Sequence, residues 1–193
     1  MRSPAQLARF LLVAALALPS ALAAETLTYV LDQDASTVTF ETDFGPDLIT
    51  GTIPLESADL KLDVDAIARS SITVVLDVSG ATASFPFAAQ ALKGPKVLAA
   101  KDHPTIGFVS SAIRRAGDEA EVTGALTIRG VTRDVTLQAR ISRPPGSSPD
   151  DLSRLTVRLT GRVNRSDFGA TGWADMVGDE VRILITARID AEG

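Results

Sequence analysis

The sequence predicts an all-β protein, an antiparallel up-and-down barrel of about eight strands with one or two short inserted helices. Short segments in which apolar and polar residues alternate recur along most of the chain. Turn-forming residues separate these segments at roughly eight- to twelve-residue intervals, which is typical of barrels and sandwiches. A single Ala-rich stretch breaks the alternation. A closed barrel is favoured because closure leaves no strand edge exposed.

The clearest strand pair is a hairpin centred on Gly130. Apolar and polar residues alternate over residues 122–128 and again over residues 135–141. Two such runs joined by a short Gly-containing connection predict antiparallel strands with one apolar and one hydrated face. Gly124 falls among the apolar positions of the first run.

The other strands are predicted from the same alternation. In the first half of the chain we expect strands at residues 27–31, 38–44, 48–54, 58–64 and 71–78, with turns at 32–34 and 45–47. In the second half we expect strands at residues 105–111, 155–163 and 181–189, with a loop at 144–151. A Gly-rich connection, residues 164–178, precedes the last strand and carries Phe168, Trp173 and Met176.

The helical interruption is predicted at residues 85–93, which are rich in Ala, Gln and Leu. Gly94 ends this stretch and Pro95 opens a second one through residue 100, because Gly and Pro are common stop and start signals of helices. We expect Phe85, Phe87 and Leu92 to face the barrel, where the helix would act either as a lid or as a plug.

The barrel interior is expected to be dry, because each predicted strand has an uninterrupted apolar face. Aromatic residues are few and Val, Ala and Thr are many, so a partly empty lumen and a filled one both remain open. A ligand held in the lumen would contact residues from several strands, the helix and the last connection. The predicted ligand-binding residues are Phe40, Phe87, Leu92, Phe108, Leu126, Leu137, Leu159, Phe168, Trp173 and Ile183.

Residues 1–23 have the pattern of a secretory signal peptide, which leaves residues 24–193 as one barrel domain. Arg2 and Arg9 precede an apolar run at residues 10–18, and small residues follow it. The run is shorter than the about 20 apolar residues that cross a bilayer. We therefore expect an exported protein whose leader is removed.

Charge and composition exclude several classes of function. Without Arg2 and Arg9 the chain has 17 basic and 24 acidic residues, a net charge of −7. An acidic surface argues against nucleic acid or an anionic membrane as the main partner. The chain has no cysteine, so its stability is expected to come from burial without disulfides. No cofactor is expected.

Catalytic and metal sites have little support. His103 is the only histidine, and no Gly-x-Ser-x-Gly motif presents a nucleophile, so His103 is interpreted as a loop residue or a polar contact at the barrel opening. One histidine without cysteine makes a zinc site a poor interpretation. Asp32, Asp34 and Ser36 begin like a calcium loop, but Thr37 replaces the required Gly, which favours an ordinary turn. We expect no enzymatic activity.

Two sets of charged residues are candidates for structural roles. Arg165 and Asp167 either pair to hold the loop before the last strand or bind the polar head of a ligand, and the first interpretation is preferred. The arginines at alternate strand positions are expected to face solvent as cross-strand partners of acids. They are Arg158, Arg162, Arg182 and Arg188.

Four segments together resemble the YceI-like family over nearly all of the chain after the leader. The hairpin at residues 124–137 is similar to the central hairpin of that family. The run Asn-Arg-Ser-Asp-Phe-Gly at residues 164–169, followed by residues 177–181, resembles its C-terminal signature. Residues 103–110 and the opening strands at residues 29–40 also match it.

The resemblance implies a lipocalin-like barrel with a long apolar cavity, a periplasmic location, and a ligand such as a polyisoprenoid or an isoprenoid quinone-like lipid. Three segments depart from the family pattern: Asp43-Phe44 where a His is frequent, Thr52-Ile53 after Gly51, and residues 97–100 in place of an aromatic stretch. These departures surround the expected opening, so no head-group contacts are carried over from the family.

The leading hypothesis is a periplasmic carrier that holds a long-chain lipid and performs no chemistry. One alternative is an enzyme that acts on a lipid-like substrate, and another is an interaction module with a solid barrel. The expected partner is an isoprenoid or other long-chain lipid, with no nucleic acid, and a homodimer remains open.

Overall fold

A computed structural model of the chain describes residues 27–63 and 65–192, so the expected signal peptide lies outside the described residues. The strands are β1 (Leu27–Phe44), β2 (Asp47–Thr52), β3 (Leu55–Leu62), β4 (Ser71–Asp77), β5 (Thr82–Ala83), β6 (Thr105–Ala116), β7 (Glu119–Ile128), β8 (Val131–Ser142), β9 (Arg154–Asn164) and β10 (Val177–Ala191). The helices are α1 (Pro86–Lys93) and two short 3-10 turns, η1 (Ile67–Arg69) and η2 (Arg165–Phe168).

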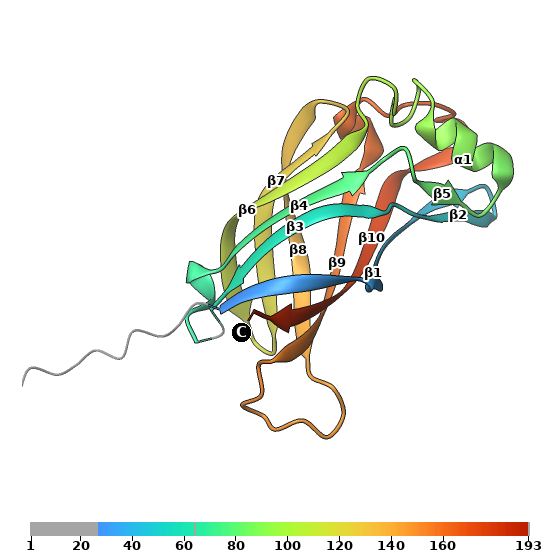
Figure 1. The fold of residues 1–193 in the computed structure, drawn as a ribbon. Helices are drawn as coiled ribbons and strands as arrows, with labels where there is room; N and C mark the ends of the chain where they lie inside the picture. Colours follow the sequence, from blue (N-terminus) through green and yellow to red (C-terminus); the bar gives the residue numbers. More distant parts are fainter. Residues whose placement is uncertain (1–26, 64, 193) are drawn as a thin grey trace, which may run out of the picture.

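Eight of these strands close into an antiparallel barrel (Figure 1). Their order around the ring is β10-β9-β8-β7-β6-β4-β3-β1, and β1 pairs again with β10. β2 and β5 extend the sheet outside this ring, beside α1. The predicted all-β barrel is confirmed.

β1 is one long strand, so the predicted division at residues 32–34 is wrong. The chain accommodates those residues as an irregularity in the pairing with β10, between Asp32 and Thr37. The Asp32 carboxylate accepts a hydrogen bond from the Ala35 backbone N–H (3.1 Å), and the Ser36 hydroxyl donates to the Asp32 carbonyl (2.6 Å). These side-chain bonds replace the missing ladder bonds and keep the strand continuous.

Splitting of β1 between two neighbours opens one end of the barrel. Its first residues, from Leu27 to Tyr29, pair with β3, whereas residues 39–44 pair with β2. β3 and the second half of β1 therefore diverge, and α1 lies at this end of the molecule (Figure 1).

The hairpin predicted around Gly130 is confirmed. Ile128 pairs with Val131, and the two residues between them both have positive φ, 53° at Arg129 and 74° at Gly130. Two consecutive left-handed residues define a type I′ turn, whose twist matches that of the flanking strands.

The first predicted helix forms and the second does not. α1 begins with Pro86 at its first position and ends at Lys93, with Gly94 as its C-cap. Beyond Gly94 the chain makes successive turns, and Ala99 has a φ of 51°, which an α-helix does not permit. The Arg129 guanidinium binds the carbonyls of Pro95 (2.8 Å) and Val97 (2.6 Å) and holds this segment in its non-helical course.

Several strands are longer than predicted, because pairing continues where the alternation fails. In β6 the register shifts between Ser110 and Ala112, so the alternation of inward and outward side chains is interrupted there. An alternation with a period of two residues therefore does not predict that the strand continues to Ala116. β10 likewise begins at Val177, before the predicted start.

Three clusters of buried side chains follow one another along the barrel. Tyr29, Leu60, Leu62, Leu155 and Ile189 fill the end opposite α1, where the Tyr29 hydroxyl donates to the Leu152 carbonyl (3.0 Å). A middle cluster comprises Ile113, Val122, Leu137, Ala139 and Leu159. A third cluster near α1 comprises Val78, Leu98, Ile106, Leu126, Val163 and Phe168. Within the described residues, no helix has both the length and the hydropathy that crossing a bilayer requires.

Candidate ligand-binding lumen

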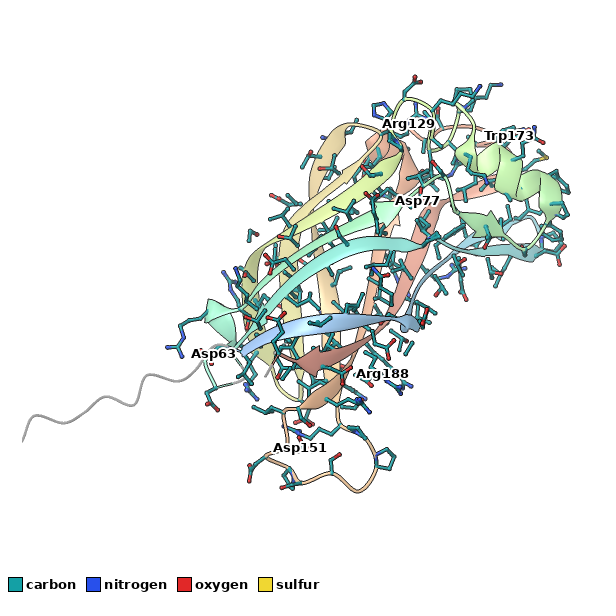
Figure 2. The ribbon with its side chains drawn as sticks, in the orientation of Figure 1. Asp63, Asp77, Arg129, Asp151, Trp173 and Arg188 are labelled. Carbon is teal, nitrogen blue, oxygen red and sulfur yellow. The ribbon has the colours of Figure 1, made fainter. Side chains whose placement is uncertain are left out.

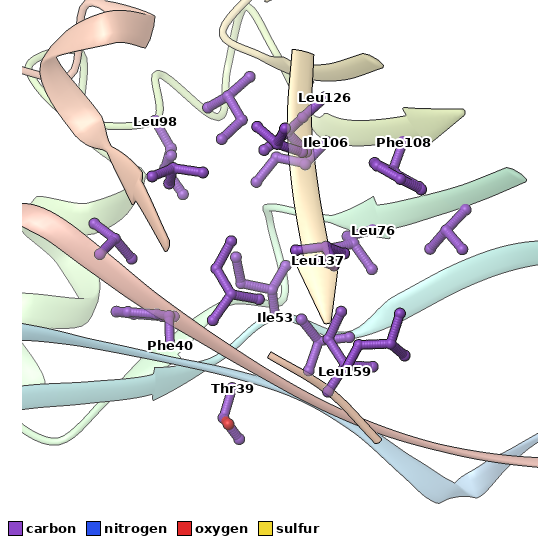
Figure 3. A pocket seen from close by; sticks show the side chains of 18 of the residues that line it. Thr39, Phe40, Ile53, Leu76, Leu98, Ile106, Phe108, Leu126, Leu137 and Leu159 are labelled. Carbon is purple, nitrogen blue, oxygen red and sulfur yellow. The ribbon is translucent and has the colours of Figure 1, made fainter. Parts of the chain in front are cut away.

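A cavity of about 800 Å³ runs inside the barrel. All eight ring strands, α1 and the connection before β10 contribute side chains to its wall, and Figure 3 shows Leu76, Leu126 and Leu137 among them. A volume of this size is typical of sites that enclose a small lipid-sized molecule. The barrel is therefore hollow, which removes the alternative of a solid interaction module.

Glycines in the strands explain why large side chains do not fill the cavity. The Phe40 ring lies over Gly51 on the paired strand, so that a Cβ there would come within 2.4 Å of the ring. A Cβ at Gly124 would meet the Phe108 ring at 2.5 Å. Leu137 occupies the corresponding place over Gly161, at 2.3 Å. Each of these side chains can lie flat along the wall because its neighbour has none.

The ten residues predicted to bind a ligand all lie on the wall of the lumen. Phe40, Phe108, Leu126, Leu137, Leu159 and Ile183 come from strands, Phe87 and Leu92 from α1, and Phe168 and Trp173 from the segment before β10. Strand alternation, which directs every second side chain inward, explains the location of the six strand residues. The other four reach the wall because α1 and the segment before β10 border the lumen. Contact with a ligand stays a prediction.

Sequence reasoning placed Gly124 among the apolar positions but missed the packing role of the strand glycines. It also missed Ala88 and Ala91 of α1, which border the cavity. The position of each glycine in the apolar–polar alternation of its strand could have revealed this packing role. Gly51, Gly124 and Gly161 each occupy the inward position of their strand, where a bulky residue would otherwise be expected.

The lumen has a closed end and an open end. The cluster around Leu155 and Ile189 closes the end opposite α1. At the other end, the lining residues Phe87, Trp173 and Met176 are 66%, 41% and 49% exposed, so the cavity reaches the surface there.

Three segments form the rim of this opening. They are α1 with the turns after it, the β1–β2 turn, and residues 169–176, which we call the rim loop. The Gly172 N–H donates to the Lys96 carbonyl (2.9 Å) and the Gly45 N–H donates to the Met176 carbonyl (3.2 Å), which ties the three together. Trp173 and α1 lie at this end, far from Asp63 (Figure 2).

α1 borders the opening and lines the lumen without filling it. Ala88 is buried, Leu92 packs against the third cluster, and Phe87 borders the cavity while remaining largely exposed. Phe85 does not line the lumen; its ring stacks on Phe87, with centroids 5.9 Å apart, and meets Phe44 at 6.4 Å. The expectation that Phe85 faces the barrel is therefore wrong.

The wall of the lumen is almost free of polar groups. Thr42 is buried, and its hydroxyl bonds to the main chain of β10 at Gly178 (3.1 Å) or Glu180 (3.0 Å). Arg165 is the charged residue of the wall, and no carboxylate or histidine belongs to the described lining.

Arg165 holds the rim loop, but not through Asp167. Its guanidinium donates to the carbonyls of Ala170 (2.6 Å), Gly172 (2.8 Å), Val177 (2.9 Å) and Gly178 (2.8 Å). The expected pair with Asp167 does not form, because Asp167 lies on the outer surface near Arg133 and Arg162. The preferred interpretation, a residue that orders the loop, holds for Arg165 alone.

His103 lies outside the lumen lining, in the loop before β6. A Cβ at Gly130 would lie 3.1 Å from its Cε1 atom, so the imidazole packs over the β7–β8 turn. Asp32 uses its carboxylate in the local bond to Ala35. Among residues 27–63 and 65–192 no group of three or more His, Asp or Glu side chains has the arrangement to hold a metal ion.

Two of the four outward arginines pair with acids as expected. Arg162 lies 3.3 Å from Glu180, and Arg182 lies 2.9 Å from Asp43 and 3.6 Å from Glu41. Arg158 and Arg188 face solvent as expected, although the described part of the chain holds no ion pair of either residue. Arg188 lies opposite Asp32 in the pairing of β1 with β10, whereas Arg158 lies opposite Thr186 and Arg140, so the expected acidic partner is wrong for Arg158.

A hollow antiparallel barrel with an apolar lumen that opens at one end defines a class of proteins suited to enclosing apolar molecules. Residues 29–189 match the model of the YceI-like domain. The chain belongs to the YceI-like family.

Relatives by sequence include Protein YceI of Salmonella arizonae and of Salmonella newport, each 30% identical over 95 residues. The chain spans about half the length of these curated relatives, 49% in each case.

Solved structures share the fold. The crystal structure of Burkholderia cenocepacia BcnA aligns with a TM-score of 0.74 at 27% identity, covering 82% of this chain and 99% of that one. A Campylobacter jejuni YceI protein aligns with a TM-score of 0.58 at 20% identity, covering 74% of this chain and 84% of that one, and supports the fold alone.

Proposed function

We propose that this protein is a carrier that encloses a long apolar amphiphile, such as a polyisoprenoid or an isoprenoid quinone-like lipid, and performs no chemistry on it. The observation that carries the proposal is the cavity of about 800 Å³ with a nearly continuous apolar wall. Removing apolar surface from water contributes about 25 cal/mol per Å², so such a wall gives affinity without specific polar contacts.

The form of the lumen supports an extended ligand. Its lining continues from Leu62 and Ile189 at the closed end to Phe87 and Trp173 at the rim. A chain would insert its apolar tail toward the closed end and leave its head near the rim. The isoprenoid character of the chain comes from the family resemblance.

The same lining supports binding in preference to catalysis. General acid–base chemistry needs a carboxylate, histidine or similar group within hydrogen-bond reach of the substrate. The described wall offers Arg165, Thr39, Thr42 and Gln90 as its polar side chains, none of which is a typical proton acceptor in catalysis.

We also propose that the protein works in the periplasm after removal of residues 1–23. The basis is the sequence pattern of two arginines, a short apolar run and small residues. N-terminal sequencing of periplasmic material is expected to find a start near Ala24, and retention of Met1 would refute the proposal.

The carrier proposal is tested by extracting the purified, correctly folded protein with organic solvent and analysing the extract by mass spectrometry. We expect a long-chain isoprenoid lipid in near-equimolar amount. Leu137→Trp is a second test of the proposal, because this variant fills part of the lumen and should retain less lipid than the parent. Absence of any enriched lipid, together with failure of the parent to bind the neutral apolar dye Nile red, would contradict the proposal.

A further inference from the structure

Arg165 places a positive charge in the wall of an otherwise uncharged lumen. The residue is 8% exposed, and the described lining contains no aspartate or glutamate to balance it. This arrangement is unexpected in a chain whose acidic residues outnumber its basic ones, 24 to 19. A buried cation without a counter-ion is costly and creates a positive potential in its surroundings.

The hydrogen bonds of Arg165 order the rim loop and leave its charge in place. A guanidinium has five N–H donors. Four are used by the carbonyls of Ala170, Gly172, Val177 and Gly178, and the fifth, on Nη2, has no partner among the residues that the structure describes. Carbonyl oxygens satisfy donors but carry no net charge, and no carboxylate of the described residues forms an ion pair with Arg165.

The acid nearest to Arg165 along β10 is committed elsewhere. Asp179 accepts bonds from the backbone N–H (2.9 Å) and the hydroxyl (2.7 Å) of Ser166, on the exposed side of the barrel. The observed arrangement leaves the cation available to a group inside the lumen.

Arg165 also lies at the end of the lumen where a head group would lie. It borders the cavity together with Ala170, Gly172 and Trp173 of the rim loop, whereas the opposite end is closed by apolar side chains. A chain inserted tail first would bring its head to the Arg165 end.

We propose that Arg165 forms a head-group subsite for an anionic oxygen group, a carboxylate or a phosphate, and that the lumen selects anionic amphiphiles over neutral ones with the same tail. An anionic oxygen near Arg165 would accept the unused N–H and neutralise the buried charge, as charge-assisted bonds do. The inference rests on the proposed carrier function and specifies the chemical class of its ligand.

The test compares three ligands with one tail: farnesol, farnesoic acid and farnesyl phosphate. Their affinities are measured by displacement of Nile red from the intact protein at pH 7.5, about one and a half units above the second ionisation of a phosphate monoester. For the parent we expect each anion to bind about tenfold more tightly than farnesol. The two anions distinguish carboxylate from phosphate as the preferred head.

The variant is Arg165→Met, which removes the charge and keeps a long side chain. Loss of the loop bonds should weaken all three ligands, so the readout is the ratio of anion affinity to farnesol affinity, which should fall to near one. Arg165→Lys keeps the charge and should retain most of the ratio. Arg162→Met is the matched control, because Arg162 lies three positions before Arg165, near the end of β9, and its side chain is 69% exposed.

A measurement on the parent covers the case in which Arg165→Met does not fold. The carboxyl group of farnesoic acid is isotope-labelled and titrated by NMR while bound. A nearby cation lowers the pKa of a carboxylic acid, and an apolar site without one raises it. We expect a pKa for the bound acid below that of the free acid.

Three results would overturn the inference. They are equal binding of farnesol and the anions by the parent, an unchanged ratio in Arg165→Met, and a raised pKa of the bound acid. Binding of farnesol in any of these cases leaves the carrier proposal standing. Failure of the parent to bind all three ligands would instead count against the carrier proposal itself.

Discussion

Asp63 illustrates how one buried carboxylate organises the closed end of the barrel. Its carboxylate accepts bonds from the backbone N–H groups of Ala66 (2.7 Å) and Asp65 (3.1 Å), and from the Arg69 guanidinium (2.7 Å at Nε). The Ala66 N–H and the Arg69 cation hold the pKa of Asp63 below its ordinary value, against the effect of burial, which raises it. These bonds fix η1 between β3 and β4.

The lowered pKa of Asp63 predicts a loss of stability in acid. Because its pKa is lower in the folded state, the unfolded state binds more protons as the pH falls below about 4, and the stabilisation is lost through the folded pKa. Asp63→Asn should lower the melting temperature by several degrees at pH 7, and its difference from the parent should shrink in acid. Thermal unfolding between pH 7 and pH 2 checks this prediction.

Asp65→Asn is the control for this experiment, because Asp65 is exposed and offers Asp63 its backbone N–H. It should follow the parent at every pH. A constant difference between parent and Asp63→Asn down to pH 2 would contradict the assigned role of the carboxylate.

At the scale of elements, paired strands keep the lumen open by combining a large side chain with a glycine. Phe108 of β6 lies across Gly124 of β7, and Phe40 and Leu137 lie across Gly51 and Gly161 in the same way. The large residue thus contributes apolar surface to the wall without occupying the centre of the barrel.

Gly124→Ala should therefore disturb both stability and binding. The new Cβ would lie 2.5 Å from the Phe108 ring and 2.5 Å from the Val109 carbonyl oxygen, so the ring must turn toward the lumen or the strands must separate. We expect destabilisation of about 1–3 kcal/mol, typical of an overpacked core. Urea unfolding measures the loss, and Nile red binding should weaken as well.

Gly107→Ala is the matched control on the partner strand, since a Cβ there meets nothing within 4 Å. An alanine at a compatible strand position should leave stability unchanged or raise it by about 0.4–1 kcal/mol. Equal effects of the two substitutions would show that the Phe108 contact is not the cause.

At the scale of the molecule, closure of β1 on β10 makes the barrel one cooperative unit around the cavity. A ligand in the lumen contacts strands from the whole ring, so its binding free energy should stabilise the entire fold. A ligand that binds only the folded state contributes about 2.7 kcal/mol at a concentration of one hundred times its Kd.

Saturation with farnesol should therefore raise the melting temperature by about 5–10 °C for a chain of this size. Leu137→Trp, which fills space in the lumen, should show a smaller rise at the same farnesol concentration. Gln138→Trp adds the same ring at the next position, which is exposed, and should keep the full rise. An equal rise in both variants would place the ligand outside the lumen. Differential scanning calorimetry gives all three values.

The sequence by itself determined the all-β class, the β7–β8 hairpin, α1 and the inward set of apolar residues. These features depend on local patterns. Side-chain direction alternates along a strand, and a turn such as Arg129-Gly130 depends on the conformations of neighbouring residues. The six strand residues predicted for the lumen consequently share one wall.

Only the tertiary structure decided the features that depend on distant contacts. Residues 27–44 form one strand because β10 pairs along most of their length, and residues 95–100 are not helical because Arg129 binds their carbonyls. The hollow lumen arises from glycines that meet large side chains of other strands. The charge of Arg165 suggests a head-group subsite only because the fold places this residue in a lumen wall whose described lining has no carboxylate. The phase of the glycines was visible in the sequence, but which side chains meet depends on the pairing and course of the whole chain, which local patterns do not specify.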